Sequence, residues 1–217
     1  MDEHDHSHGH GHSHDHGHNH DPIEVSEGAG HYEVMVHAIK ELLIEKGVIT
    51  GEDIRKTLEF MDTRTPALGA QVVARAWADP AFKQRLLADG TKAVGEMGIP
   101  MGDAELIVVE NTPGVHNMVV CTLCSCYPRT VLGLPPDWYK SRNYRSRAVR
   151  EPRAVLKEFG TDVPADVTVR VHDSNADMRY LVLPMRPKGT DGWSADRLAQ
   201  LVTRDCMVGV AVPEAGR

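Results

Sequence analysis

The sequence predicts an α+β fold, in which an N-terminal helical arm precedes a layered α-β-β-α domain that carries a cysteine-rich loop. Apolar residues recur every three to four positions from residue 31 to residue 90, as in amphipathic helices. After Gly98-Ile99-Pro100 the spacing changes to short apolar runs of strand length. With 217 residues the chain can build one substantial core, with or without an extended arm. We therefore expect three parts, over residues 1–22, 23–98 and 99–217.

The first part is a histidine-rich tail, which we expect to be disordered without metal because nothing in it can pack a core. Its imidazoles, interleaved with Asp, suit borderline divalent ions such as Co(II), Ni(II) and Zn(II). Two interpretations stay open: the tail gathers metal for a site elsewhere in the chain, or it is a solubilising segment that binds metal adventitiously. Nine of the 13 histidines occupy every second position, at His4, His6, His8, His10, His12, His14, His16, His18 and His20.

The helical arm is predicted to contain four helices. The first begins at His31 and stops at Gly47, and Thr50 caps the second, which has acidic residues in its first turn. Pro66 ends the second helix, the third covers 67–78, and the fourth runs to residue 90. The arm has no sheet of its own, so we expect its apolar face to pack on a partner or on the later core. Both His31 and His37 are expected at the surface.

The last part alternates strands with helices. A buried strand is predicted over 105–110, and a second over 117–120 delivers the cysteine-rich loop. His172 lies in a strand pattern and is expected to be structural. The further expected elements are a helix over 152–159, a strand pair formed by 167–172 and 180–183, a capped helix over 194–202 and a last strand over 206–212.

Composition excludes several classes of function. The formal net charge of −7 gives no electrostatic case for binding nucleic acid or an anionic membrane surface. No apolar run approaches the roughly 20 residues needed to cross a bilayer, and the N-terminus lacks the apolar core of a signal peptide. We therefore expect a cytoplasmic protein. Four cysteines, three of them clustered, do not resemble a disulfide framework, and the isolated Cys206 is expected to be a small buried hydrophobe.

The cysteine-rich loop places Cys121, Cys124 and Cys126 within six positions. If a metal binds the sulfurs of Cys124 and Cys126, the deprotonated amides of Ser125 and Cys126 can bind it too, in five- and six-membered chelate rings. These two sulfurs and two nitrogens form a square plane around the metal. Cys121 can then bind the metal from one side of that plane, which leaves the sixth coordination position open. We call this set of Cys121, Cys124, Ser125 and Cys126 the claw. On spacing alone, a structural zinc site completed by His116 or Cys206 remains an equal alternative.

The donor set of the claw indicates the kind of metal. Three thiolates and two amidates are soft and strong-field, which favours low-spin Co(III) or Fe(III). An open position beside such an ion is typical of Lewis-acid catalysis. Five negative donors on a trivalent ion leave an excess of two negative charges, which a buried site must offset. Oxygenation of the sulfurs spreads this charge onto the added oxygens, and arginines can then bind those oxygens through charge-assisted hydrogen bonds.

The motif Val120-Cys121-Thr122-Leu123-Cys124-Ser125-Cys126-Tyr127 resembles the metal-binding signature of the nitrile hydratase α subunit, in its cobalt-type form. The resemblance covers about residues 31 to 212. It also includes Glu110-Asn111-Thr112-Pro113, Val131-Leu132-Gly133-Leu134-Pro135-Pro136, Trp138-Tyr139-Lys140, Arg150-Glu151-Pro152-Arg153, Met178-Arg179-Tyr180 and Gly189-Thr190-Asp191-Gly192-Trp193.

This resemblance implies specific chemistry for the claw. It implies one Co(III), with Fe(III) less favoured, held by the thiolate of Cys121, the sulfinic acid form of Cys124, the sulfenic acid form of Cys126 and the amide nitrogens of Ser125 and Cys126. Residues 99–217 would then be the metal-binding catalytic domain. The implied reaction adds water to a small nitrile to give an amide, with Cys126, Cys124 and Ser125 at the reaction centre and the sulfenate oxygen as nucleophile or base.

The resemblance also implies partners. These are a β subunit, in an αβ pair or a heterotetramer, and an activator protein that loads the metal. The basic run of Lys140, Arg142, Arg145, Arg147, Arg150 and Arg153 is either a solvated surface or a source of charge for the claw. Because the arginines that grip the oxidised sulfurs come from the β subunit in this family, we favour a subunit-facing surface.

Arg129 departs from the family pattern, which has Trp three residues after the last cysteine of the motif. That position lines the substrate pocket in the family. We therefore expect a polar or anionic substrate, unless Arg129 turns outward. The nearer alternative function is that of a thiocyanate-hydrolase-type subunit, which uses the same cobalt claw on an anion. The remoter alternative is a non-catalytic metal-storage or chaperone protein, in which the tail is the functional part.

Overall fold

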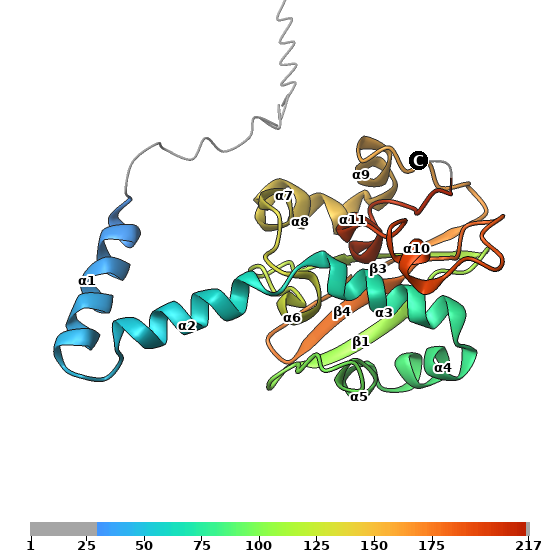
Figure 1. Cartoon of the computed structure of the whole chain (residues 1–217). Helices are drawn as coiled ribbons and strands as arrows, with labels where there is room; N and C mark the ends of the chain where they lie inside the picture. Colours follow the sequence, from blue (N-terminus) through green and yellow to red (C-terminus); the bar gives the residue numbers. More distant parts are fainter. Residues whose placement is uncertain (1–29, 216–217) are drawn as a thin grey trace, which may run out of the picture.

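The computed structural model describes residues 30–215. The predicted tail over 1–22 lies outside the described residues. Within them, the helical arm begins with α1 (His31–Glu45) and α2 (Gly51–Asp62), which project from the body of the molecule (Figure 1). The predicted cap at Thr50 is confirmed: its side chain accepts a hydrogen bond from the Asp53 amide at 3.1 Å, and the Asp53 carboxylate accepts one from the Thr50 amide at 2.9 Å. This reciprocal capping box fixes where α2 begins.

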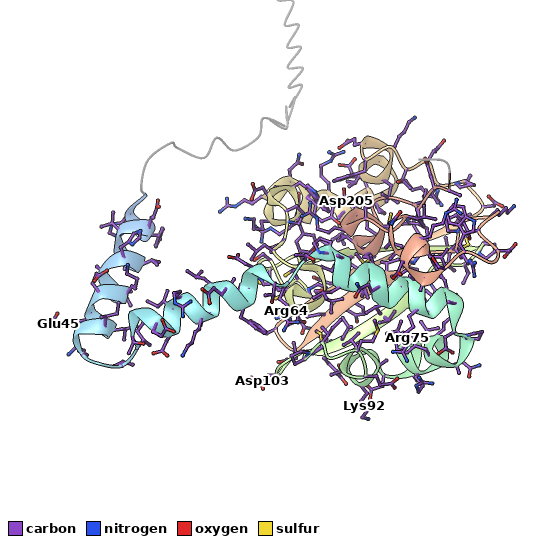
Figure 2. All side chains as sticks on the ribbon, viewed as in Figure 1. Glu45, Arg64, Arg75, Lys92, Asp103 and Asp205 are labelled. Carbon is purple, nitrogen blue, oxygen red and sulfur yellow. The ribbon has the colours of Figure 1, made fainter. Side chains whose placement is uncertain are left out.

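Neither α1 nor α2 buries a residue against the described part of the chain. Their side chains stand clear of the body (Figure 2). His31 and His37 are exposed, as predicted. The exposed apolar side chains of this segment include Tyr32, Val34, Met35, Val36, Ile39, Leu42, Leu58 and Phe60. Of the two alternatives, packing of the apolar face on the later core is therefore not met for α1 and α2 within residues 30–215.

The next helices belong to the core. Helix α3 (Pro66–Ala78) buries six residues, and α4 (Pro80–Ala88) and α5 (Gly90–Gly95) follow with almost no linker. Asp79 caps α4 by accepting hydrogen bonds from the amides of Ala81 and Phe82, both at 3.0 Å. In the same way Asp89 accepts a bond from the Lys92 amide at 2.9 Å and opens α5. These two caps divide one apolar stretch into three consecutive helices.

Four strands form two parallel pairs. Strand β1 (Glu105–Glu110) pairs with β4 (Met178–Leu183), and β2 (Val115–Val120) pairs with β3 (Thr168–Asp173). The strands predicted over 167–172 and 180–183 exist, but the prediction that they pair with each other is wrong. Each pairs instead with a strand that lies earlier in the chain, by 53 positions for β3 and by 73 positions for β4. Alternation along a strand specifies which face is buried and does not specify such a distant neighbour.

Buried amide side chains join the two strand pairs. Asn117 on β2 donates from its side chain to the Glu110 carbonyl at 2.7 Å, and its backbone amide donates to the Asn111 side chain at 2.7 Å. On β3, His172 shares a hydrogen bond of 2.9 Å with the Asn117 side-chain oxygen and packs against Tyr180. His172 is therefore structural, as predicted.

Helices cover the strands on both sides, which confirms the layered α+β class. Helices α4 and α5 contact β1, whereas α8 (Arg142–Arg150) and α9 (Pro152–Glu158) contact β2 and β3. The short helices α6 (Arg129–Leu132) and α7 (Asp137–Lys140) follow the cysteine-rich loop, and α10 (Ala195–Ala199) packs on α3. Between residues 30 and 215 no helix combines the length and the apolar character that a membrane span requires.

The predicted last strand is wrong. Residues 204–208 form helix α11 (Arg204–Val208), capped by Thr203 and ended by Gly209 at a φ of +87°. A short apolar run of this kind fits a buried strand or a buried helix equally well, so its periodicity could not decide. A side chain at residue 209 would lie 2.1 Å from the Asn117 carbonyl oxygen, so only glycine fits there. Cys206 is buried, as predicted.

Candidate metal centre

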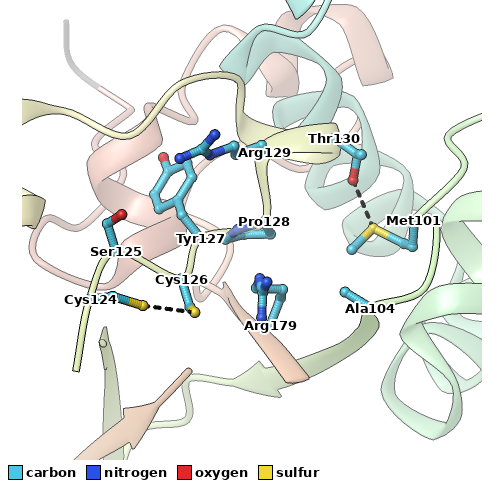
Figure 3. A pocket seen from close by; sticks show the side chains of 10 residues that line it. All are labelled: Met101, Ala104, Cys124, Ser125, Cys126, Tyr127, Pro128, Arg129, Thr130 and Arg179. Atoms are coloured by element: carbon cyan, nitrogen blue, oxygen red, sulfur yellow. Dashed lines mark hydrogen bonds between the residues drawn. The ribbon is translucent and has the colours of Figure 1, made fainter. Parts of the chain in front are cut away.

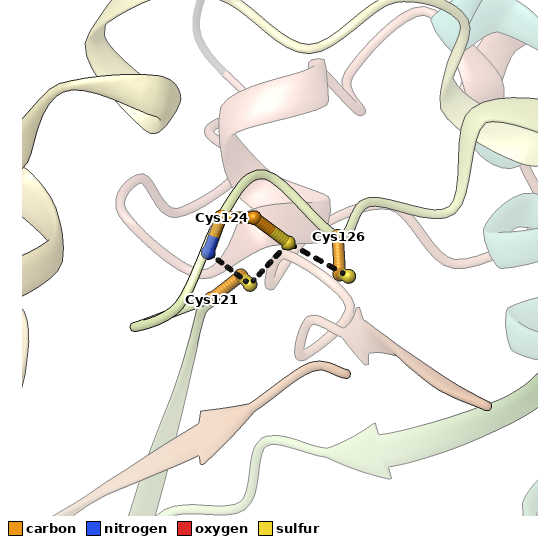
Figure 4. A group of neighbouring side chains, drawn as sticks. All are labelled: Cys121, Cys124 and Cys126. Atoms are coloured by element: carbon orange, nitrogen blue, oxygen red, sulfur yellow. Dashed lines mark hydrogen bonds between the residues drawn. The ribbon is translucent and has the colours of Figure 1, made fainter. Parts of the chain in front are cut away.

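The cysteine-rich loop leaves the end of β2 and gathers its three sulfurs. The Sγ atoms of Cys121 and Cys124 lie 3.5 Å apart, and those of Cys124 and Cys126 lie 3.2 Å apart (Figure 4). These distances are far longer than a disulfide bond, and all three cysteines are free. Within residues 30–215 these sulfurs are the only group of three or more His, Cys, Asp or Glu ligand atoms close enough to hold one metal ion.

The backbone of the loop is directed at the same point. The Cys124 amide donates to the Cys121 sulfur at 3.2 Å. The amides of Ser125 and Cys126 also act on the Cys124 sulfur and help to lower its pKa. Three sulfurs thus lie together in one loop, and backbone amides of the same loop interact with two of them.

The three thiols differ in acidity because they share hydrogen bonds. Bonds from Cys126 and then Cys121 lower the pKa of Cys124 to about 7. Burial raises the pKa of Cys126, and the neighbouring Cys124 thiol raises it further. The first proton therefore leaves the exposed Cys124, and a thiolate is the form that binds metal.

The loop is held at both ends by side chains of the body. Asp173, the last residue of β3, accepts hydrogen bonds from the Thr122 amide at 2.9 Å and the Thr122 hydroxyl at 2.6 Å. At the other end, Tyr139 on α7 donates its hydroxyl to the Cys126 carbonyl at 2.9 Å. Tyr144 donates to the Val119 carbonyl just before the loop, at 2.6 Å. Sequence reasoning assigned no role to these residues, since only the fold brings them to the loop.

A pocket of about 350 Å³ opens beside the claw (Figure 3). Arg129 stands at its wall as the first residue of α6. Arg179 on β4 also lines it, although sequence reasoning missed this residue. The sequence signal that could have pointed to Arg179 is the segment Met178-Arg179-Tyr180, which is one of the segments that resemble the nitrile hydratase α subunit. The remaining lining residues are Met101, Ala104, Cys124, Ser125, Cys126, Tyr127, Pro128 and Thr130.

The two residues considered as a fourth zinc ligand lie elsewhere. The His116 ring nitrogen Nε2 is 2.7 Å from the Gly209 carbonyl oxygen. Cys206 contacts the Thr203 hydroxyl at 3.2 Å. Neither side chain joins the cysteine group. The tetrahedral site that the spacing allowed is therefore not assembled.

None of the six residues of the basic run lines the pocket. Arg147 pairs with Glu151 and Glu158, both at 2.5 Å, and Lys140 pairs with Asp137 at 2.8 Å. Arg153 donates to backbone carbonyls, including that of Val163 at 2.9 Å. At least half of the run is thus engaged within the chain.

The fold and the loop together define a protein with a thiolate metal centre on an α+β scaffold. Residues 30–211 match the family model described as nitrile hydratase, alpha chain. The chain belongs to this family.

The relatives include enzymes with different metals and substrates. The chain is 47% identical over 207 residues to thiocyanate hydrolase subunit gamma of Thiobacillus thioparus, which covers 90% of this chain and 85% of the relative. It is 54% identical over 180 residues to the low-molecular weight cobalt-containing nitrile hydratase subunit alpha of Rhodococcus rhodochrous, a match that covers 82% of this chain and 87% of the relative. The solved structure of a mutant Fe-type nitrile hydratase from Comamonas testosteroni Ni1 superposes with a TM-score of 0.80 at 44% identity. This match covers 85% of this chain and 91% of that structure's chain. Both cobalt and iron thus occur among similar proteins.

Proposed function

We propose that this chain is the metal-bearing α subunit of a cobalt-dependent nitrile hydratase. In the reaction, the oxygen of water ends on the nitrile carbon and its two hydrogens end on the nitrogen, giving an amide. The observation that carries the proposal is the convergence of the Cys121, Cys124 and Cys126 sulfurs, all within 4.8 Å of one another.

The residues fit a trivalent cobalt ion. Cys121, Cys124, Ser125 and Cys126 would hold it through three sulfurs and two amide nitrogens. The soft donor set and the cobalt-containing relatives favour Co(III), with Fe(III) as the second choice. When bound, this ion supplies Lewis acidity at its open position.

The chain's own residues supply the surroundings of the reaction. Cys126, as sulfenate, presents an oxygen to the pocket as nucleophile or base. Cys124, as sulfinate, and Ser125 line the same wall. The pocket holds only a small substrate, since its volume of about 350 Å³ lies near the lower limit of ordinary ligand sites.

The exposed apolar face of α1 and α2 supports a β subunit as partner, in an αβ pair or its doubled form. Eight large apolar side chains lie on these two helices without cover from the described part of the chain. A patch of this size on a folded protein marks an interaction surface. The anionic claw, which lies at the surface through Cys124, is a second place for partner contacts.

The test is metal analysis of the chain purified with its β subunit, combined with the mass of the tryptic peptide that ends at Arg129. We expect one tightly held cobalt per chain and about three added oxygens on the peptide. Cys126→Ala should abolish nitrile hydration. The control Cys206→Ala, which lies outside the claw, should keep the cobalt. Zinc with unmodified cysteines would overturn the proposal and favour the storage protein.

Arg129 favours a second candidate, hydration of thiocyanate. Arg129 lines the pocket, and a relative at 47% identity is a thiocyanate hydrolase subunit. Assays with thiocyanate and with neutral nitriles separate the two functions. Arg129→Trp should shift the preference toward apolar nitriles, and an unaltered substrate profile would refute the role of Arg129.

The histidine-rich tail is proposed to gather cobalt for the claw, together with an activator protein that loads it. The support is its density of imidazoles, nine within the first 20 residues. Deleting residues 2–20 should lower cobalt incorporation when cobalt is limiting and leave it unchanged when cobalt is abundant. Equal loading at limiting cobalt would show that the tail binds metal only adventitiously.

A further inference from the structure

The net charge of this chain is confined to its first 29 residues. Residues 1–29 contain seven carboxylates and neither Lys nor Arg. The whole formal net charge of −7 therefore belongs to them, and residues 30–217 are neutral overall. We call residues 1–29 the acidic segment; it includes the nine histidines at alternate positions. A segment with so much charge of one sign is attracted to a cationic surface that it can reach.

Helix α8 presents a cationic surface. It contains four arginines and no carboxylate. Arg147 is neutralised by the glutamates that follow the helix. Arg142, Arg145 and Arg150, in contrast, have no carboxylate within 4.0 Å in the described part of the chain. Their spacing of three and eight positions puts these three arginines on one side of the helix, which we call the basic face.

The basic face is accessible and has donors to offer. Arg142 and Arg150 are exposed, and Arg145 is half-buried. Between residues 30 and 215, Nε of Arg145 has no hydrogen-bond partner. Nε of Arg150 donates to the Ser146 carbonyl at 3.2 Å, which engages one of its five N–H groups. Since carboxylates make strong charge-assisted hydrogen bonds to guanidiniums, this face fits an acidic segment.

The opposite side of α8 is joined to the loop of the claw. Tyr144 on that side is buried and donates its hydroxyl to the Val119 carbonyl at 2.6 Å, two residues before Cys121. Tyr139 on the preceding helix α7 donates to the Cys126 carbonyl at 2.9 Å, at the other end of the loop. A helix with its side chains is about 10–12 Å across. A segment that lies on the basic face is therefore about one helix diameter from the start of the loop.

The acidic segment is long enough to reach this face. It precedes α1, the first helix of the arm. The 15 residues of α1 and the 12 of α2 together span about 40 Å, even if they lie in one line. A segment of 29 residues spans up to about 100 Å when extended. It can therefore return to the body without any movement of the arm. In the view of Figure 1, α7 and α8 lie on the same side of the body as α1.

We propose that the acidic segment, residues 1–29, docks on the basic face formed by Arg142, Arg145 and Arg150, and that docking holds its metal-binding imidazoles beside the claw. The role in metal delivery rests on the proposed function, whereas docking is a property of the chain alone. Because both metal sites then lie on one chain, transfer of cobalt becomes intramolecular, which raises its effective concentration at the claw.

Docking weakens as the imidazoles fill with metal. Each bound Co(II) adds two positive charges, so about four ions offset the seven carboxylates of the acidic segment. The segment is therefore attracted to the basic face most strongly when cobalt is scarce. When cobalt is abundant the attraction disappears, and delivery from the imidazoles is then no longer needed.

The first experiment detects docking by NMR of the isotope-labelled, metal-free full chain at pH 8. It compares the natural chain with a variant that keeps all nine histidines but has a neutral segment. This segment-neutral variant carries Asp2→Asn, Glu3→Gln, Asp5→Asn, Asp15→Asn, Asp21→Asn, Glu24→Gln and Glu27→Gln. The amide signals of residues 142–150 should differ between the two chains. Raising the salt from about 20 mM to about 500 mM should move the natural signals toward those of the variant. Identical signals for α8 in both chains would overturn docking.

The same spectra separate the acidic segment from other occupants of the basic face. The differences at α8 should not depend on protein concentration, because docking occurs within one chain. Differences that grow with concentration would assign the face to the acidic segment of a second copy. Signals of α8 that respond to the β subunit and not to the carboxylates of the segment would assign it to the β subunit. Either result would overturn the proposal.

The second experiment measures cobalt at the claw when cobalt is limiting, in the complex with the β subunit. Only cobalt that survives a chelator wash is counted, since imidazoles release divalent ions to the chelator. The segment-neutral variant should hold about 3- to 10-fold less cobalt than the natural chain, although its imidazoles are intact. The face variant Arg142→Gln/Arg145→Gln/Arg150→Gln should show the same loss. Combining both variants should cause no further loss, because each removes the same contact.

The control variant Lys46→Gln/Arg170→Gln/Lys188→Gln removes three exposed cations that lie outside α8. It should load cobalt like the natural chain. Circular dichroism checks the fold of each variant, and the segment-neutral variant decides the test if the face variant does not fold. Additive losses, an equal loss in the control, or full loading of the segment-neutral variant would overturn delivery by docking. If no chain retains cobalt even when cobalt is abundant, the proposed function fails, while the α8 signals still decide whether the segment docks.

Discussion

The arm formed by α1 and α2 and the claw both expose groups that a folded chain usually covers, but the body of the molecule contacts the two regions to different extents. Helices α1 and α2 expose their apolar face and bury no residue against the described chain. The claw loop exposes Cys124, yet Asp173, Tyr139 and Tyr144 fix the loop from three separate elements. The comparison teaches that side chains of the body hold the claw loop in place, whereas the described part of the chain leaves the apolar face of the arm without cover. A short helix without tertiary packing is only marginally stable in water.

The largest expected difference concerns stability. Leu181 on β4 is fully buried, so Leu181→Ala should lower the free energy of unfolding by about 2–5 kcal/mol. The matched change Ile39→Ala in the arm, where the side chain is half exposed, should cost less than about 0.5 kcal/mol in the chain alone. Urea unfolding of the metal-free chain measures both. Similar losses would show that the arm packs on the body after all.

The second expected effect is on association. Replacing Ile39 and Phe60 together by Asp should weaken binding of the β subunit by about 100-fold, because charges on the apolar face cannot be buried. Cobalt content per chain should stay the same. Calorimetric titration with the β subunit measures the affinity, and Glu41→Gln on the same helix serves as the control. Undiminished affinity would place the β subunit elsewhere on the chain.

The third effect tests the bracing of the claw. Asp173→Asn removes the charge from both hydrogen bonds to Thr122, so metal retention should fall by about 10- to 100-fold. Competition with a chelator measures the retention. The exposed Asp166→Asn, on the loop before β3, should behave like the unmodified chain. Equal retention in both variants would mean that the sulfurs alone hold the loop in place.

The smallest effect is a shift in acidity. Hydrogen bonds from Cys126 and Cys121 lower the pKa of Cys124 to about 7, below the roughly 8.5 of a free thiol. Because the folded pKa is the lower one, the thiolate stabilises the fold fully above the unfolded value, and this contribution is lost as pH falls through 7. The alkylation rate of Cys124 in the metal-free chain should therefore be half-maximal near pH 7. A midpoint at 8.5 would indicate a loop that is not preorganised.

The sequence predicts individual elements better than it predicts their neighbours. Capping at Thr50 and the apolar run over 105–110 depend on residues close together in the chain, and both are found. Strands β3 and β4 were expected to pair with each other, because alternation says nothing about partners far away. Residues 206–212 are predicted to form a strand, but part of this segment belongs to helix α11, and only the close approach of Gly209 to Asn117 shows why that helix must stop there.

The same limit applies to the candidate site. The claw sulfurs were predicted to gather because they lie within six positions, where chain geometry alone decides. Arg129 is also near them in the sequence. Arg179 and Asp173 reach the loop from about 50 residues away, and no local pattern connects them to it.

The link between Thr122 and Asp173 also sets an order of events during synthesis. The two residues are 51 positions apart. At about 5–20 residues per second, the ribosome adds Asp173 roughly 3–10 s after Thr122. During that interval the three thiols are already made but the loop lacks its anchor. A fully braced claw therefore exists only after β3 has been translated, so metal capture by that claw follows the synthesis of β3.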